Sequence, residues 1–194
     1  MRMLVRCLAA GLVALLGACA HPITIAPNPS AIAAPAGLQV QKSVAYVIGA
    51  ADRDREVTTD GGGGDSVRYF PYRELESGIF QALSAVYSRV TLLRSIGEKQ
   101  APANSDIALI FVPTITTASS SSSILTWPPT SFFITLKYAV QNAAGNVLYS
   151  NQVLGTGAAQ FEEFTSNFGL AGTRAAEQVL LNFKAQVAGA RELR

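Results

Sequence analysis

The first nineteen residues constrain this chain more than any other stretch, because they decide how much of it remains to fold. A basic start with Arg2 and Arg6 precedes the apolar run Leu8–Leu16 and the small residues Gly17 and Ala18. This layout is typical of an export signal, and the run is shorter than the roughly 20 apolar residues that a membrane-spanning helix needs. Removal of the first 18 of 194 residues leaves 176, a length that suits one domain.

The end of this segment carries a short motif. Leu16–Cys19 resembles the bacterial lipobox, in which a branched residue and two small residues precede a cysteine that is acylated and becomes the mature N-terminus. By this resemblance cleavage follows Ala18, Cys19 receives diacylglyceryl and palmitate groups, and the chain is a lipoprotein of a Gram-negative cell envelope. An aspartate after the cysteine would resemble the inner-membrane retention signal, so Ala20 implies the periplasmic face of the outer membrane. The alternative is an ordinary signal peptide in which Cys19 has no role.

Cysteine and charge counts restrict the function classes. Cys7 leaves with the signal peptide and Cys19 would be acylated, so the mature chain has no disulfide. Loss of Arg2 and Arg6 lowers the Lys and Arg count from 15 to 13, which equals the Asp and Glu count of 13. A neutral chain without a basic stripe gives no support for nucleic-acid binding. We expect no cofactor.

The mature chain divides into a tether and a domain. Residues 1–18 are the signal peptide, and residues 19–37 are rich in Pro and Ala, which favours an extended, flexible tether. Such a tether could span roughly 55 Å if it is mostly polyproline-like, at about 3.1 Å per residue. Residues 38–194 are then a single periplasmic α/β domain.

Hydrophobic periodicity predicts five strands and two helices in this domain. Alternation predicts strands near residues 38–48, 132–140 and 147–153, the last two joined by a turn at Gly145. Apolar residues predict a short strand near residues 90–93 and a strand over 106–117 that is apolar on both faces and therefore central in the sheet. Three- and four-residue spacing predicts helices over residues 73–88 and from about residue 162 to the C-terminus. The order predicts an α+β fold with a mostly antiparallel four- to five-stranded sheet and two helices packed on one face.

This order of elements resembles the small α/β modules of Gram-negative outer-membrane lipoproteins, including CsgG, PelC, the activators of penicillin-binding proteins and YajG-type proteins. The resemblance covers most of the mature chain and depends on Leu16–Cys19, the strand Val44–Ile48, the helix Leu75–Val86 and the hairpin Phe132–Val153. It implies an envelope role and carries over no active-site residue.

Residues that could carry chemistry have simpler interpretations. His21 follows the acylated cysteine closely on the tether, which excludes a folded Ser-His or His-metal site. The acidic stretch Asp52–Asp65 could gather around calcium, but its interleaved arginines favour a solvated, mobile loop, so no metal site is predicted. The carboxylate pairs Glu74 and Glu76, and Glu162 and Glu163, suit glycosidase chemistry, yet each lies near a predicted helix start, which carboxylates stabilise.

An apolar stretch between two predicted strands is the candidate contact loop: Ile124, Leu125, Trp127, Pro128 and Pro129. Tryptophan is enriched at interfaces and at membrane boundaries. The alternative is that Trp127 folds back over a sheet edge and packs on the core.

These observations predict a non-enzymatic binding or scaffold lipoprotein that contacts an envelope protein and is held to the membrane through Cys19. A second hypothesis is an oligomeric component of a secretion or polysaccharide-export apparatus, in which residues 119–133 form part of a ring or of a membrane-contacting hairpin. An enzyme is the least supported class.

Overall fold

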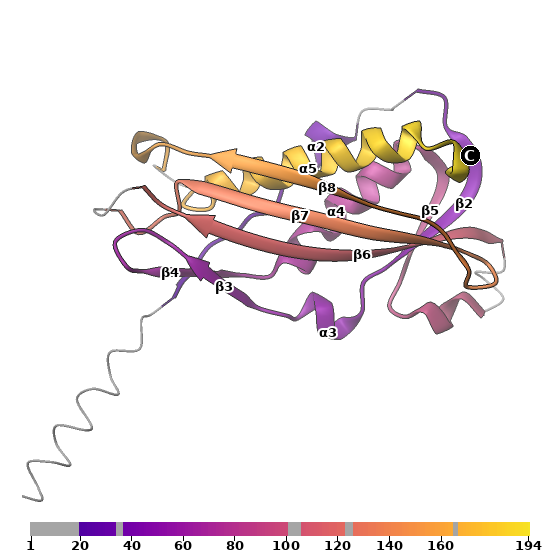
Figure 1. Ribbon diagram of the computed structural model, residues 1–194, viewed down its shortest axis with the longest axis horizontal. Coiled ribbons are helices and arrows are strands. Elements are labelled where there is room, and N and C mark those ends of the chain that lie inside the picture. Colours follow the sequence, from indigo (N-terminus) through magenta and orange to yellow (C-terminus); the bar gives the residue numbers. More distant parts are fainter. Residues whose placement is uncertain (1–19, 34–36, 101–105, 123–125, 165–166) are drawn as a thin grey trace, which may run out of the picture.

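The computed structural model describes residues 20–33, 37–100, 106–122, 126–164 and 167–194 (Figure 1). Its strands are β1 (His21–Pro22), β2 (Val40–Val47), β3 (Val57–Asp60), β4 (Ser66–Tyr69), β5 (Tyr87–Leu93), β6 (Ile107–Ser120), β7 (Ser131–Asn142) and β8 (Val147–Ala158). Its helices are α2 (Pro29–Ile32), α3 (Ala50–Arg53), α4 (Pro71–Ser84) and α5 (Leu170–Gly189), with 3-10 turns η1 (Ile96–Gln100), η3 (Phe161–Glu163) and η4 (Arg191–Leu193). Among these residues, no helix is long and apolar enough to cross a lipid bilayer.

The α+β fold and its five-stranded sheet are confirmed. The sheet has the order β5-β2-β6-β7-β8, with α4 and α5 behind it in the view of Figure 1. Strands β6, β7 and β8 pair antiparallel, whereas β2 runs parallel to both β5 and β6. The parallel β2–β5 pair arises because α4 lies between these strands in the chain and returns it to the same end of the sheet.

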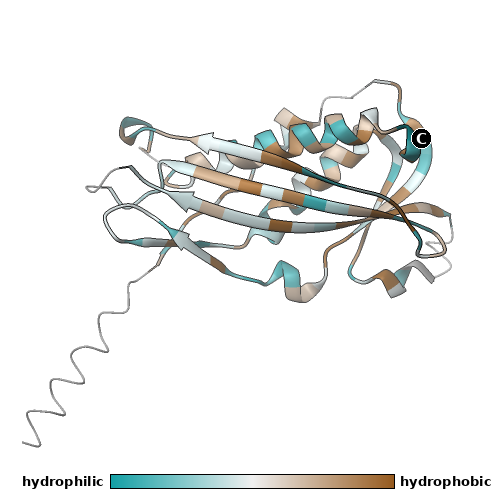
Figure 2. Cartoon of the chain, viewed as in Figure 1, coloured by the Kyte–Doolittle hydropathy of each residue, from teal (hydrophilic) through white to brown (hydrophobic). Residues whose placement is uncertain are grey.

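Buried and accessible residues alternate along β7, a strand that carries both hydrophobic and hydrophilic residues in Figure 2. Even-numbered residues from Phe132 to Val140 point to the helices, and odd-numbered residues point to the open face. Phe183 of α5 meets Tyr138 of β7 and Phe111 of β6, with ring centroids 4.8 and 6.2 Å apart. The main core therefore lies between the sheet and the two helices.

A second, three-stranded sheet was not predicted. It has the order β1-β4-β3, with β3 and β4 antiparallel and β1 parallel to β4. The expectation of a mobile loop over residues 52–65 is therefore wrong for most of this stretch. Gly61 in this stretch packs closely because it lacks a Cβ, which would lie 2.4 Å from the carbonyl oxygen of Trp127.

The N-terminal segment packs on the domain, contrary to the expected tether. Ile25 and Ile32 are fully buried and belong to the main core. A glycine on each long helix lies beside them: a Cβ at Gly172 would lie 2.3 Å from Ile25, and one at Gly78 would lie 2.4 Å from Leu180 and 3.3 Å from Ile32. Proline-rich composition was therefore misleading, since residues 21–33 are fixed by the few apolar side chains between the prolines.

Helix α5 lies in backbone contact with the edge strand β8. A Cβ at Gly155 would lie 2.2 Å from the carbonyl oxygen of Ala175, and a Cβ at Gly157 would lie 2.0 Å from that of Ala171. Only a residue without a side chain permits this approach. Side chains spaced four residues apart on α5 also bond to the β8 backbone: Arg174 and Asn182 donate to the carbonyls of Ala158 and Leu154, and Gln178 accepts from the N–H of Thr156. These hydrogen bonds use backbone N–H and C=O groups on the outer edge of β8, which would otherwise be free to pair with another strand.

We expect Gly157→Ala to lower the free energy of unfolding by about 1–3 kcal/mol, because the new methyl group would push α5 away from β8. Urea denaturation measures this change. The matched control is Gly189→Ala near the end of α5, where a Cβ would meet no atom within 4 Å. Equal stability of the two variants would contradict the close packing.

Candidate contact surface

The residues of the predicted contact loop lie at the end of the domain where β6 ends and β7 begins. Pro128 and Pro129 are buried, and Trp127 is partly buried against the core. Ile124 and Leu125 lie outside the described residues, as do Ala18 and Cys19. Trp127 therefore agrees in part with both alternatives, a contact residue and a residue packed on the core, because its side chain packs on the core and is only partly buried.

Trp127 contacts two aromatic rings from distant parts of the chain. The His21 ring stacks on it with centroids 4.2 Å apart and planes at 24°, and the Phe168 ring lies with its centroid 4.8 Å away and its plane tilted by 51°. The expectation that His21 is a solvated tether residue is wrong, because β1 pairs with β4 and fixes its backbone. Nε2 of His21 also lies 3.6 Å from a carboxylate oxygen of Asp65 in the β3–β4 turn.

Backbone contacts fix the segments that carry these rings. The N–H of Gly62 donates to the carbonyl of Trp127 at 2.9 Å, which joins the β3–β4 turn to the loop before β7. Gly169 lies against the N-terminal segment, since a Cβ there would be 1.8 Å from the carbonyl oxygen of Thr24. Phe168 is therefore placed beside the N-terminal segment by its glycine neighbour.

The turn η3 adds exposed aromatic surface beside Phe168. A cavity of about 300 Å³ is lined by Phe161, Glu162, Phe164 and Phe168. Phe161 is 64% exposed and Phe168 is 46% exposed, large values for such apolar side chains. The prediction of a helix from about residue 162 is wrong at its start, because α5 begins only at Leu170. Phe161 and Phe168 therefore lie outside this helix and reach the surface, whereas Phe164 is buried.

Glu163 stabilises this turn and pairs with α5. Its side chain accepts from the N–H of Gln160 and forms an ion pair with Arg174 at 2.7 Å. The hydrogen bond from Arg174 and that from the Gln160 backbone lower the pKa of Glu163 to about 2. The interpretation of this carboxylate as a helix-start residue agrees with the capping box at η3.

Glu74 joins the N-terminal segment to the start of α4. One oxygen accepts from the hydroxyl of Thr24 at 3.0 Å and from the N–H of Ile25, and the other accepts from the N–H of Phe70 at 3.1 Å. Three donors on one carboxylate hold residues 24 and 25 against the helix start. Charge-assisted bonds of this kind are stronger than neutral ones.

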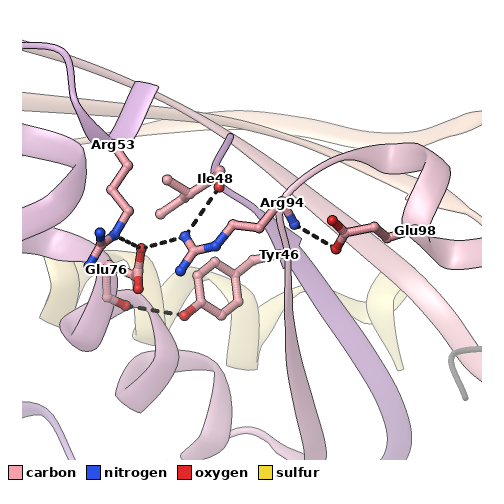
Figure 3. A network of polar contacts seen from close by, with 6 residues as sticks. All are labelled: Tyr46, Ile48, Arg53, Glu76, Arg94 and Glu98. Atoms are coloured by element: carbon pink, nitrogen blue, oxygen red, sulfur yellow. Dashed lines mark hydrogen bonds and ion pairs between the residues drawn. The ribbon is translucent and has the colours of Figure 1, made fainter. Parts of the chain in front are cut away.

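Glu76, the second carboxylate of this pair, contacts a different set of residues from Glu74. Its side chain accepts from Arg53 at 3.1 Å and from Arg94 at 3.0 Å (Figure 3). Arg94 also donates to the carbonyl of Ile48, which ties the ends of β2 and β5 together. Burial raises the pKa of the neighbouring Tyr46 to about 12, with a smaller contribution from Glu76.

The acidic residues between positions 52 and 65 are dispersed over several elements. Asp52 of α3 forms an ion pair with Arg55, which follows the helix. A carboxylate oxygen of Glu56 lies 3.7 Å from a guanidinium nitrogen of Arg68 in β4. Asp60 and Asp65 line a polar cavity of about 330 Å³ that Ser120 and Ser121 also line. Within the described ranges, no three His, Cys, Asp or Glu side chains gather in a way that could hold a metal ion.

Glu74→Gln should release residues 21–28 from the helices, because the amide would turn an N–H group towards N–H donors. We expect a loss of about 1–3 kcal/mol in unfolding free energy and faster amide exchange in this segment. Hydrogen-exchange mass spectrometry of the purified chain measures both. Glu162→Gln, a change at an exposed carboxylate, is the control, and the same exchange in both variants would contradict the role of Glu74.

Comparisons with known proteins assign the chain to no family and give only weak similarity to solved structures. No family model matches the chain, and no curated protein matches its sequence. A Xanthomonas campestris protein of the family DUF330 superposes with a TM-score of 0.45 and 14% identity, over 87% of this chain and 90% of that one. A Caulobacter crescentus CB15 protein, described provisionally as a lipoprotein, superposes with a TM-score of 0.33 and 12% identity, over 75% and 90%. An uncharacterised protein superposes with a TM-score of 0.40 and 8% identity, over 87% of this chain and 96% of that one. The resemblance to CsgG-, PelC- and YajG-type modules stays a prediction.

Proposed function

We propose that this protein is a lipid-anchored, non-enzymatic binding protein of the cell envelope, attached through Cys19 to the periplasmic face of the outer membrane. The observation that carries the proposal is the sequence Leu16–Cys19, placed directly before a domain that begins to fold at His21. Buried methylene groups contribute about 0.8 kcal/mol each, so several acyl chains give lasting attachment.

The placement of the carboxylates supports a binding role over catalysis. Glycosidase chemistry needs two carboxyl groups that face one substrate. Glu74 instead binds the N-terminal segment, Glu76 binds Arg53 and Arg94, and Glu163 binds Arg174. Each is held by groups of the fold itself, which leaves it poorly placed to exchange protons with a substrate.

The open face of β6, β7 and β8 is the surface that we assign to an envelope protein partner. Phe133 is 42% exposed there, and register places Ala118 and Thr156 beside it. Leu154 lies opposite Thr135 on the same face and is also exposed. Exposed apolar residues among short polar ones, with Lys137 as the charged neighbour on β7, suit a protein contact.

Lipidation is tested by Cys19→Ala in cells that express the full chain. We expect loss of radioactive palmitate incorporation and release of the protein from sedimented membranes, because the acyl acceptor is gone. Cys7→Ala is the matched control, since Cys7 leaves with the signal peptide and its loss should change neither result. A Cys19→Ala protein that still sediments with membranes would count against the proposal.

The partner surface is tested by a photoreactive phenylalanine analogue placed at position 133 in cells. We expect a discrete crosslinked product with another envelope protein. Phe80 of α4, 39% exposed and therefore similar in accessibility, lies on the helix layer and serves as control. Identical products at both positions, or none at position 133, would contradict the surface. A product with twice the mass of the chain would favour the oligomeric alternative.

A further inference from the structure

We infer that the domain lies directly on the membrane surface, and that its aromatic end contacts the lipid headgroup region. The aromatic end is defined by His21, Trp127, Phe161 and Phe168. The inference rests on the proposed acylation of Cys19, and it adds an orientation and a contact surface that acylation alone does not supply.

The reach of the chain sets the distance between anchor and domain. His21 is only two positions after Cys19, with Ala20 between them, and an extended chain spans at most about 3.6 Å per residue. The Cα atom of Cys19 therefore lies within about 7 Å of that of His21. An anchor on a free tether of 18 residues would instead have allowed roughly 55 Å.

His21 and the residues after it cannot move away to lengthen this connection without breaking the fold. His21 and Pro22 pair with Val67 and Arg68 of β4, and the N–H of Ile23 donates to the carbonyl of Arg68 at 3.0 Å. Beyond them, Glu74 binds Thr24 and Ile25, and the Ile25 side chain is fully buried. The lipid-bearing residue is thus tied to one fixed point of the domain.

The surface around this point has the chemistry of a membrane interface. Trp127 stacks on His21 itself, Phe168 touches Trp127, and Phe161 shares a cavity with Phe168. Aromatic rings with one polar side favour the boundary between headgroups and acyl chains. Exposure of Phe161 and Phe168 to water is costly for the isolated domain, and contact with lipid removes that cost.

Charge at this end indicates which lipids the surface accepts. Asp65 is half-exposed beside His21, and the η3 turn carries Glu162 and Glu163, with Arg174 already paired to Glu163. Binding to anionic lipids depends on basic clusters, which this acidic surface does not resemble. The contact therefore depends on apolar insertion and is expected on zwitterionic phosphatidylcholine.

The orientation of the whole domain follows. Figure 1 shows the C-terminus and the β7–β8 turn at the end of the long axis opposite to the loop that connects β6 to β7. Strands β7 and β8, each of 12 residues, rise about 40 Å at roughly 3.3 Å per residue. With the aromatic end on the membrane, the turn at Gly145 points away from it, and the open sheet face is available to a partner beside the protein.

The chain contains one tryptophan, so Trp127 itself reports the contact. The experiment uses the full lipidated protein, purified from membranes and inserted into phosphatidylcholine vesicles. A second set of vesicles contains phosphatidylcholine brominated near the headgroup end of its acyl chains, because bromine quenches tryptophan fluorescence on contact. We expect most of the Trp127 emission to be lost in brominated vesicles.

Two surface variants test whether the aromatic end makes the contact. Phe161→Ser should weaken quenching, whereas Leu148→Ser, at an exposed position beside the β7–β8 turn, should leave it unchanged. Equal emission in both vesicle types from protein whose Cys19 carries lipid by mass spectrometry would overturn the inference and leave the proposed function intact. Equal quenching in the two variants would also overturn it. A mass spectrum without lipid on Cys19 would remove the proposed function and the inference together.

Discussion

Attachment of the N-terminal segment to the two long helices is the interaction on which the rest of the molecule depends. Ile25 and Ile32 pack beside Gly172 and Gly78, where no side chain is in the way. The carboxylate of Glu74 accepts a hydrogen bond from the backbone N–H of Ile25. Apolar burial and a charge-assisted hydrogen bond thus act on the same few residues. Because of them, the first described residues form part of the core instead of a connection to it.

The same attachment links the fold to the proposed role. It places His21 against Trp127, brings Phe168 to the same end through Gly169, and leaves the anchor cysteine two residues away. A lipoprotein on a long tether samples a wide volume of the periplasm. A domain seated on its own anchor has a fixed height and orientation, which restricts the partners that can reach its open sheet face.

Glycines decide how the layers approach each other. Gly155 and Gly157 let α5 lie on the backbone of β8, where Arg174, Gln178 and Asn182 bond to outward groups of the strand. The edge is thereby covered by the domain's own helix over residues 154–158. Association of copies through this part of β8 would have to displace those bonds, which weakens the ring hypothesis at this edge.

Periodicity in the sequence determined the five strands of the main sheet, the two long helices and the buried face of β7, because residues adjacent in the chain set these local patterns. Leu16–Cys19 likewise predicts the anchor from a contiguous motif. The tertiary structure alone decided that β2 runs parallel to its neighbours, that residues 50–69 form a helix turn and a hairpin, and that the proline-rich segment packs. It also brought together His21, Trp127 and Phe168. These outcomes depend on contacts between residues far apart in the chain, where a single buried isoleucine or an absent Cβ outweighs local composition.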